Sequence, residues 1–234
     1  MGQIRELEYI ARIGWVKPLL SAVRANRRLE HLVLRWRQHR LSDLAFAIDT
    51  RLNYLPNLAE RIDEPMRRVV ASLSESSQPL AEYLRRRVAL RITDRKALSD
   101  VLIAASSFMS ESRALFENLA EFYREFTKEC FGQASIGTKA SYEAMARMTR
   151  RRGWATALQK KRHDILHRRS LWLAFDIDLD RQPLFEPIFL LNWRPGSHRL
   201  KDTIRRETVL EIRQRLPEAA HTMRDRLIKR VKAV

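Results

Sequence analysis

The chain has 234 residues, of which 45 are lysine or arginine and 28 are aspartate or glutamate, so its formal net charge is +17. Such a charge favours binding to phosphate backbones, although an anionic membrane surface or an acidic protein would also be attracted. The single cysteine, Cys130, excludes an intramolecular disulfide and leaves a thiol or zinc site without partners. We expect Cys130 to have a packing role.

The sequence contains no signal for membrane attachment. Its N-terminus carries charge from Arg5 onward, and Glu6 stands where a myristoylation signal requires Ser or Thr. The longest apolar stretches, 101–105 and 188–191, are far too short to span a bilayer. We therefore expect a cytoplasmic protein that has no membrane partner.

Helical periodicity dominates the first third of the chain. An amphipathic segment begins at Ile4, and Pro18 is expected to break or restart it. Further helices are expected over 19–36, 41–52 and 56–73.

The segment 74–79, Ser-Glu-Ser-Ser-Gln-Pro, is the clearest linker signal because it is small, polar and closed by proline. We therefore predict a soft domain boundary there. The expected domains are an N-terminal helical region of unknown role over 1–78 and a second domain over 79–234, whose first helix spans 80–90.

A long helix is expected to follow, capped by Thr93 or Asp94 and ending near Phe131. It carries large apolar side chains at spacings of one, three and four residues. This spacing is typical of a buried helix face and disfavours a base-stacking surface. The predicted core stripe consists of Leu115, Phe116, Leu119, Phe122, Tyr123 and Phe126.

The pattern then changes from helical to alternating. A loop over 132–137 and a basic amphipathic stretch over 141–152 lead to a helix expected over 154–167. Alternating apolar residues next predict a β-hairpin at about 170–193, in which Pro187 limits the second strand to an edge or a bulge. A terminal helix over 200–231, kinked at proline, completes the chain.

The helix expected over 154–167 carries the sequence Arg162-His163-Asp164-Ile165-Leu166-His167. An imidazole exchanges protons near neutral pH, and a guanidinium holds phosphate without losing its charge. These groups are sufficient to cut RNA without a metal. His163 and His167 lack the glutamate of a zinc-protease helix, which leaves a metal site as a minor alternative, and we expect no metal or cofactor.

A chain rich in arginine produces loose Arg-to-His matches by chance, and two others occur, from Arg24 to His31 and from Arg215 to His221. The match ending at His167 differs because a polar residue directly follows its arginine and four residues separate the pair. It also lies within a dense run of cations. These flanking residues are Lys160, Lys161, Arg168 and Arg169.

This pattern resembles that of the HEPN superfamily (higher eukaryotes and prokaryotes nucleotide-binding), whose ribonucleases carry arginine, a polar residue, three variable residues and histidine. The resemblance covers about 79–234, whereas 1–78 resembles no family that we can name. It implies a helical bundle of the HEPN type for this part of the chain. Together with the residue patterns above, the expected fold is mainly α: this bundle with a β-hairpin inserted after the motif helix, plus an N-terminal helical extension. The hairpin departs from the plain bundle.

The resemblance also implies a homodimer in which two motifs meet to form one metal-independent endoribonuclease cleft, as in many antiphage and toxin systems. The implied catalytic residues are Arg162, His167 and His163. The expected partners are RNA and an antitoxin or activating protein. The expected RNA-binding residues are Lys160, Lys161, Arg168, Arg169, Arg150, Arg151 and Arg152.

Two alternatives from other functional classes stay open. A noncatalytic nucleic-acid-binding module would bind RNA with a steep salt dependence and leave it intact. A helical scaffold or regulatory subunit would use its basic face to dock an acidic partner.

Overall fold

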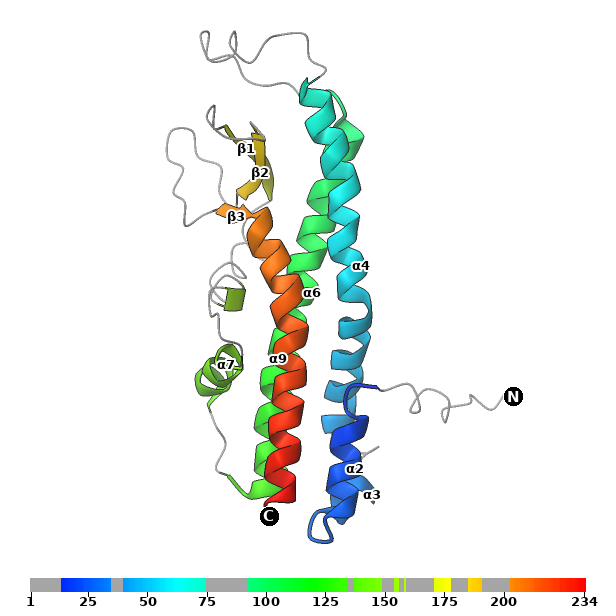
Figure 1. Cartoon of the computed structure of the whole chain (residues 1–234), viewed down its shortest axis with the longest axis vertical. Helices are drawn as coiled ribbons and strands as arrows, with labels where there is room; N and C mark the ends of the chain where they lie inside the picture. Colours follow the sequence, from blue (N-terminus) through cyan, green and yellow to red (C-terminus); the bar gives the residue numbers. More distant parts are fainter. Residues whose placement is uncertain are drawn as a thin grey trace, which may run out of the picture. The chain divides into compact units, whose positions relative to one another are not determined.

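The computed structural model describes part of the chain, and within that part the protein is mainly helical with a small antiparallel sheet (Figure 1). The mainly α class and the hairpin are therefore confirmed, whereas a bundle of the HEPN type stays a prediction. The described residues are 14–34, 40–74, 92–133, 137–148, 154, 155, 158, 171–177, 185–190 and 203–234.

The chain divides into two compact units. Unit 1 comprises 1–54, 111–156 and 212–234, and unit 2 comprises 55–110 and 157–211. Three long helices contribute residues to both units: α4 (Arg40–Ser74), α6 (Arg95–Phe131) and α9 (Arg206–Lys232). The boundary predicted near residue 78 lies outside the described residues and stays a prediction.

The first described helices belong to unit 1. Pro18 lies in the first turn of α2 (Lys17–Ala25), where a missing N–H costs nothing, so a helix begins at this proline. The segment expected before it lies outside the described residues. The expected continuous helix over 19–36 is interrupted before α3 (Glu30–Leu34). Asn26 causes the break, because its side-chain oxygen accepts a hydrogen bond from the backbone N–H of Arg28 at 3.0 Å and competes with helical hydrogen bonding.

The predicted apolar stripe of α6 forms the core of unit 1. Leu115, Phe116, Leu119, Phe122 and Phe126 are buried, as expected, and Tyr123 is half-buried. The helix ends at Phe131, and Gly132 follows with a φ of 60°, the left-handed conformation that glycine adopts readily at a helix end. The predicted end of the helix is thus confirmed.

Trp15 joins three parts of unit 1. Its backbone N–H donates to Asp49 at 2.9 Å, and its indole N–H donates to the carbonyl oxygen of Ala220 at 3.1 Å. Its ring packs edge-on against Phe122, with the centroids 5.2 Å apart. Trp15 therefore fixes the entry into α2 against α4, α6 and α9.

Replacing Trp15 should destabilise the protein strongly. We expect Trp15→Ala to lower the free energy of unfolding by about 3–5 kcal/mol, because removing a large buried ring leaves a cavity. Trp15→Phe, which keeps one buried aromatic ring but loses the indole donor and some buried volume, should cost less, about 1–2 kcal/mol. Urea unfolding followed by circular dichroism measures both, and equal stability of the two variants would contradict the packing role.

Two separate helices were expected over 41–52 and 56–73, and this prediction is wrong, because α4 continues through Pro56 and Pro65. A proline inside a helix removes a hydrogen bond and costs roughly 3 kcal/mol. Burial of a large apolar side chain contributes about 1.5–3 kcal/mol, so a continuous buried face offsets this cost. The buried side chains on either side of the prolines are Leu55, Ala59, Ile62, Met66 and Val69.

Asp94 is the N-cap of α6, as predicted. One carboxylate oxygen accepts the N–H of Ala97 at 2.8 Å, which is the N3 position of the helix, and the other accepts a hydrogen bond from Arg68 at 2.6 Å. The bond from Ala97 and the pairing with Arg68 lower the pKa of Asp94 below its ordinary value. Asp94 therefore ties α4 to α6 within unit 2.

The pH dependence of stability should reveal this cap. Because the pKa of Asp94 is lower in the folded state, its contribution is present above the unfolded pKa of about 3.9 and is lost as the pH falls through the folded value. Asp94→Ala should melt below Asp94→Asn, which keeps a capping oxygen, and both should melt below the wild type at pH 7. The difference in melting temperature between the wild type and Asp94→Asn should disappear in acid. A difference that widens in acid would refute this assignment.

The predicted hairpin is confirmed in unit 2. Strands β1 (Trp172–Ile177) and β2 (Phe185–Leu190) pair antiparallel, with Trp172 opposite Leu190. A third strand, β3 (Thr203–Arg205), makes β2 the middle strand, so its expected edge position is wrong. Pro187 is tolerated because β3 pairs only with 188–190 and leaves that position with one paired neighbour.

Strand β3 was not predicted, because the segment before α9 was expected to be helical from residue 200. Pro217 lies inside α9, as expected for a terminal helix that continues through this proline. Leu216, Ala219 and Ala220 are fully buried around this proline, so the apolar face continues across it.

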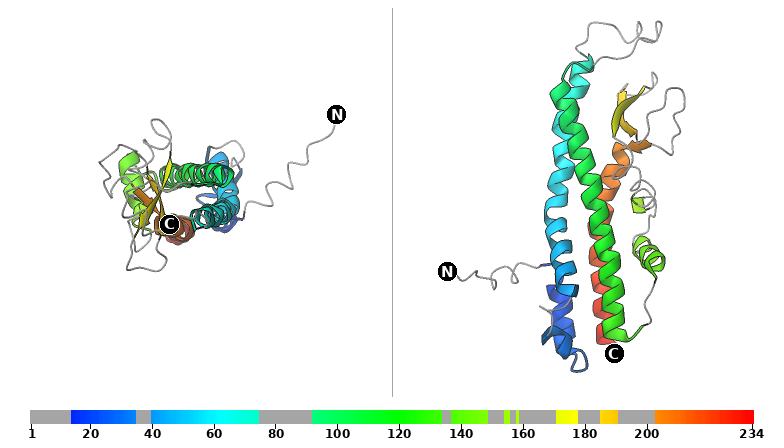
Figure 2. Two further views of the ribbon diagram at one scale, coloured as in Figure 1. Left: turned by 90° about the horizontal axis from the view of Figure 1, so that it is seen from above. Right: turned by 180° about the vertical axis from the view of Figure 1, so that it is seen from behind.

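Helix α7 (Thr138–Ala146) lies beside the part of α6 that belongs to unit 1 (Figure 2).

Candidate functional site

The predicted catalytic motif lies outside the described residues. The structure therefore neither places its members nor brings them together, and their roles stay predictions. The same is true of the expected RNA-binding cations. These residues are Arg162, His163 and His167, with Arg150, Arg151, Arg152, Lys160, Lys161, Arg168 and Arg169.

Described residues on both sides of the motif are firmly packed. Trp154 and Ala155 are helical and buried in unit 1, and Trp154 packs edge-on against Phe116 at a centroid distance of 5.6 Å. Leu158 and Leu171 are buried in unit 2. The helical state of residues 154, 155 and 158 agrees with the helix expected there.

A buried guanidinium lies against Phe116, the ring that packs on Trp154. The side chain of Arg113 on α6 is 7% exposed and donates through Nε to Glu117 at 3.1 Å. The centre of its guanidinium lies 5.0 Å from the Tyr142 ring and 5.7 Å from the Phe116 ring. Such cation–π contacts and the ion pair offset the cost of burying the charge.

One nitrogen of this guanidinium, Nη1, is buried without a hydrogen-bond partner in the part of the chain that the structure describes. The burial of Arg113 was not predicted. The spacing of apolar residues in the sequence could have indicated it. Met109 lies four residues before Arg113 and Phe116 three residues after it, and both are buried on the apolar face of α6. An arginine at such a position indicates a charge held inside the core.

The described imidazoles do not form a catalytic cluster with each other. His31 is exposed on α3, and His221 is exposed on α9, where partial desolvation and then Arg224 lower its pKa. No group of histidine, cysteine and carboxylate side chains that could hold a metal ion occurs among the described residues. The expectation of no metal at His163 and His167 stays untested.

Two other groups have strongly shifted pKa values for structural reasons. Burial, followed by the hydrogen bond to Glu111, raises the pKa of Tyr54 to about 12. Glu111 also accepts a hydrogen bond from Arg51 at 3.0 Å, so its charge is balanced. Burial likewise raises the pKa of the Cys130 thiol to about 12.

The Cys130 thiol should therefore be inert in the folded protein. Since the thiolate is the reactive form, a buried thiol with a pKa of about 12 should not react with a disulfide reagent at pH 8. One equivalent should react after unfolding in urea. Ellman's reagent measures this, and rapid labelling of the folded chain would show that Cys130 is accessible.

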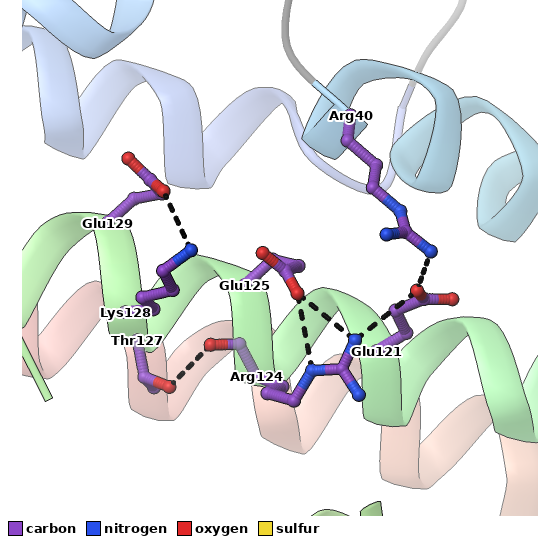
Figure 3. A network of polar contacts seen from close by, with 7 residues as sticks. All are labelled: Arg40, Glu121, Arg124, Glu125, Thr127, Lys128 and Glu129. Atoms are coloured by element: carbon purple, nitrogen blue, oxygen red, sulfur yellow. Dashed lines mark hydrogen bonds and ion pairs between the residues drawn. The ribbon is translucent and has the colours of Figure 1, made fainter. Parts of the chain in front are cut away.

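Most charges along the unit 1 part of α6 are neutralised locally. Arg124 contacts Glu125 at 3.1 Å and Glu121 at 3.4 Å, and Arg40 of α4 pairs with the same Glu121 (Figure 3). These contacts form a network that links the two helices. Cations held in this way are less available to an external anion than unpaired ones.

Comparison of the chain with protein-family models, with curated proteins and with solved structures found no match. None of the described helices is both long enough and apolar enough to cross a membrane. The expected HEPN membership accordingly rests on the motif and the order of the elements.

Proposed function

We propose that this protein is a metal-independent endoribonuclease of the HEPN type, acting in antiphage defence or in a toxin–antitoxin system. The observation that carries the proposal is the sequence from Arg162 to His167, within a dense run of cations. The mainly helical fold and the hairpin that begins after Leu171 are compatible with this assignment. The net charge of +17 supports RNA as the substrate.

In the proposed mechanism the nucleophile is the substrate's own 2′-OH. His167 takes or supplies the proton during attack on the adjacent phosphate, and Arg162 stabilises the charge that develops on the phosphate oxygens. His163 orients the substrate or assists proton transfer. The bond to the 5′ oxygen breaks, leaving a 2′,3′-cyclic phosphate and a 5′-OH.

The proposed assembly is a homodimer, because one motif supplies too few groups for the complete site. Two copies would meet at a two-fold axis and line a basic groove with Arg162, His167 and some of Lys161, Arg168 and Arg169. Light scattering should show a dimer at micromolar concentration. A strict monomer that cuts RNA would contradict this assembly.

Cleavage should persist in EDTA, should release cyclic phosphate ends and should spare DNA of the same sequence. His167→Ala and Arg162→Ala should each lower the rate by at least about 100-fold, since proton transfer and charge stabilisation each contribute that much or more. Labelled single-stranded RNA resolved on denaturing gels provides the measurement.

His31→Ala is the matched control, because it removes an exposed imidazole from outside the motif and should leave the rate unchanged. Retained cleavage in both motif variants would refute the assignment. Tight binding of intact RNA with no cleavage would favour a nucleic-acid-binding module. Binding of neither nucleic acid would favour a scaffold or regulatory subunit.

A further inference from the structure

One end of unit 1 gathers exposed cations from two segments that are distant in sequence. Helix α2 ends at Ala25, and the turn that follows it contacts the last turns of α9. The side-chain amide of Asn26 donates to the carbonyl oxygen of Val231 at 2.9 Å, and Arg28 donates to the main-chain oxygen of Val234 at 3.2 Å. The basic end, as we call it, consists of Arg24, Arg27, Arg28, Arg226, Lys229 and Lys232, all exposed.

The basic end brings together several cations that nearby side-chain carboxylates do not balance. Among the described residues, no side-chain carboxylate forms an ion pair with any of these six cations, although Arg28 contacts the main-chain oxygen of Val234. The arginines of the network in Figure 3, by contrast, are paired with side-chain carboxylates. The nearby acids Asp225 and Glu129 have cationic partners of their own, Arg224 and Lys128. Glu30 is the exposed acid next to the turn.

Helix dipoles explain part of this arrangement. Helices α2 and α9 end here, and cations in a last turn stabilise the negative end of a helix by about 0.3–1 kcal/mol each. Arg27 and Arg28, however, lie in the turn between helices. Several cations beyond those needed at the helix ends therefore remain available to an external anion.

We propose that the basic end binds the phosphate backbone of a single-stranded nucleic acid. Guanidinium groups bind phosphate bidentately, and Arg226, Lys229 and Lys232 follow α9 over about 9 Å, enough to contact successive phosphates. A membrane-binding face would also need exposed large apolar anchors. The described residues of this end provide only Val234, which is 52% exposed.

In the context of the proposed ribonuclease, this surface would hold RNA outside the cleft, and to that extent the inference rests on the proposed function. Binding and cleavage can nevertheless be separated. The inference concerns phosphates alone, so single-stranded DNA should bind the basic end as RNA does. DNA should still escape cleavage.

The experiment uses the full chain with His167→Ala, so that bound RNA is not cut. The test variant adds Arg24→Gln, Arg27→Gln and Lys229→Gln. The matched control adds Arg61→Gln, Arg95→Gln and Lys139→Gln, which are exposed elsewhere and have no ion pair among the described residues. Both variants thus lose two arginines and one lysine, so their net charges are equal.

Fluorescence anisotropy of labelled single-stranded RNA is measured from about 50 to about 200 mM salt. The test variant should lose at least about tenfold in affinity, and its log–log salt slope should fall by about 0.7 for each phosphate that is no longer neutralised. The control should change by less than about twofold. Arg27→Gln alone, in an exposed turn, should show a smaller loss in the same direction if the triple variant is unstable.

Equal losses in the test and control variants would overturn the inference, because net charge alone would then explain binding. A lower Tm with unchanged RNA affinity would show that these cations serve only the helix ends. Loss of binding to phosphatidylcholine–phosphatidylserine vesicles with RNA affinity unchanged would assign the surface to a membrane and also overturn it. Loss of RNA affinity at the basic end, with cleavage unaffected by the motif variants, would sustain this inference and reject the proposed cleft.

Discussion

Burial of one face of α6 is the interaction on which the rest of unit 1 depends. Phe116 and Phe122 are fully buried, and each is the packing partner of a tryptophan from another part of the chain, Trp154 and Trp15 respectively. Large buried side chains each contribute about 1.5–3 kcal/mol. The stripe therefore organises both the N-terminal helices and the segment that leads toward the proposed motif.

Electrostatics impose the second constraint, because a chain with a net charge of +17 repels itself. In the described structure, ion pairs between arginines and carboxylates reduce this electrostatic repulsion. Arg124 and Arg40 share Glu121, and Arg113 is held by Glu117 and two aromatic rings. The cations of the basic end have no side-chain carboxylate partner among the described residues and are available to a polyanion. Phosphates bound there would relieve part of the repulsion that ion pairing does not remove.

The sequence predicted elements whose signals are local. The cap at Asp94, the apolar stripe through Phe116 and Phe122, and the hairpin all follow from spacing and turn chemistry within a short window. The break expected before Pro56 was wrong, because the tertiary burial that keeps α4 continuous cannot be recognised within such a short window.

Long-range features could not be predicted for the same reason. β3 is a short strand whose pairing with β2 depends on a partner distant from its own segment, and the basic end exists only because the turn after α2 contacts the end of α9. The helical spacing of Arg113 relative to the apolar residues of α6 indicated that it is buried. Nothing in the sequence indicated its contact with Tyr142. The motif from Arg162 to His167 can be recognised from the sequence alone. It lies outside the described residues.

The central claim is that the substrate's own 2′-OH attacks the phosphate. The most direct measurement uses a DNA oligonucleotide that carries one ribonucleotide, incubated with the wild-type chain in EDTA. The account predicts a single cut, directly 3′ of that ribose, with a cyclic phosphate on the upstream product. Cleavage at the deoxynucleotides, or a product with a 5′-phosphate, would contradict it.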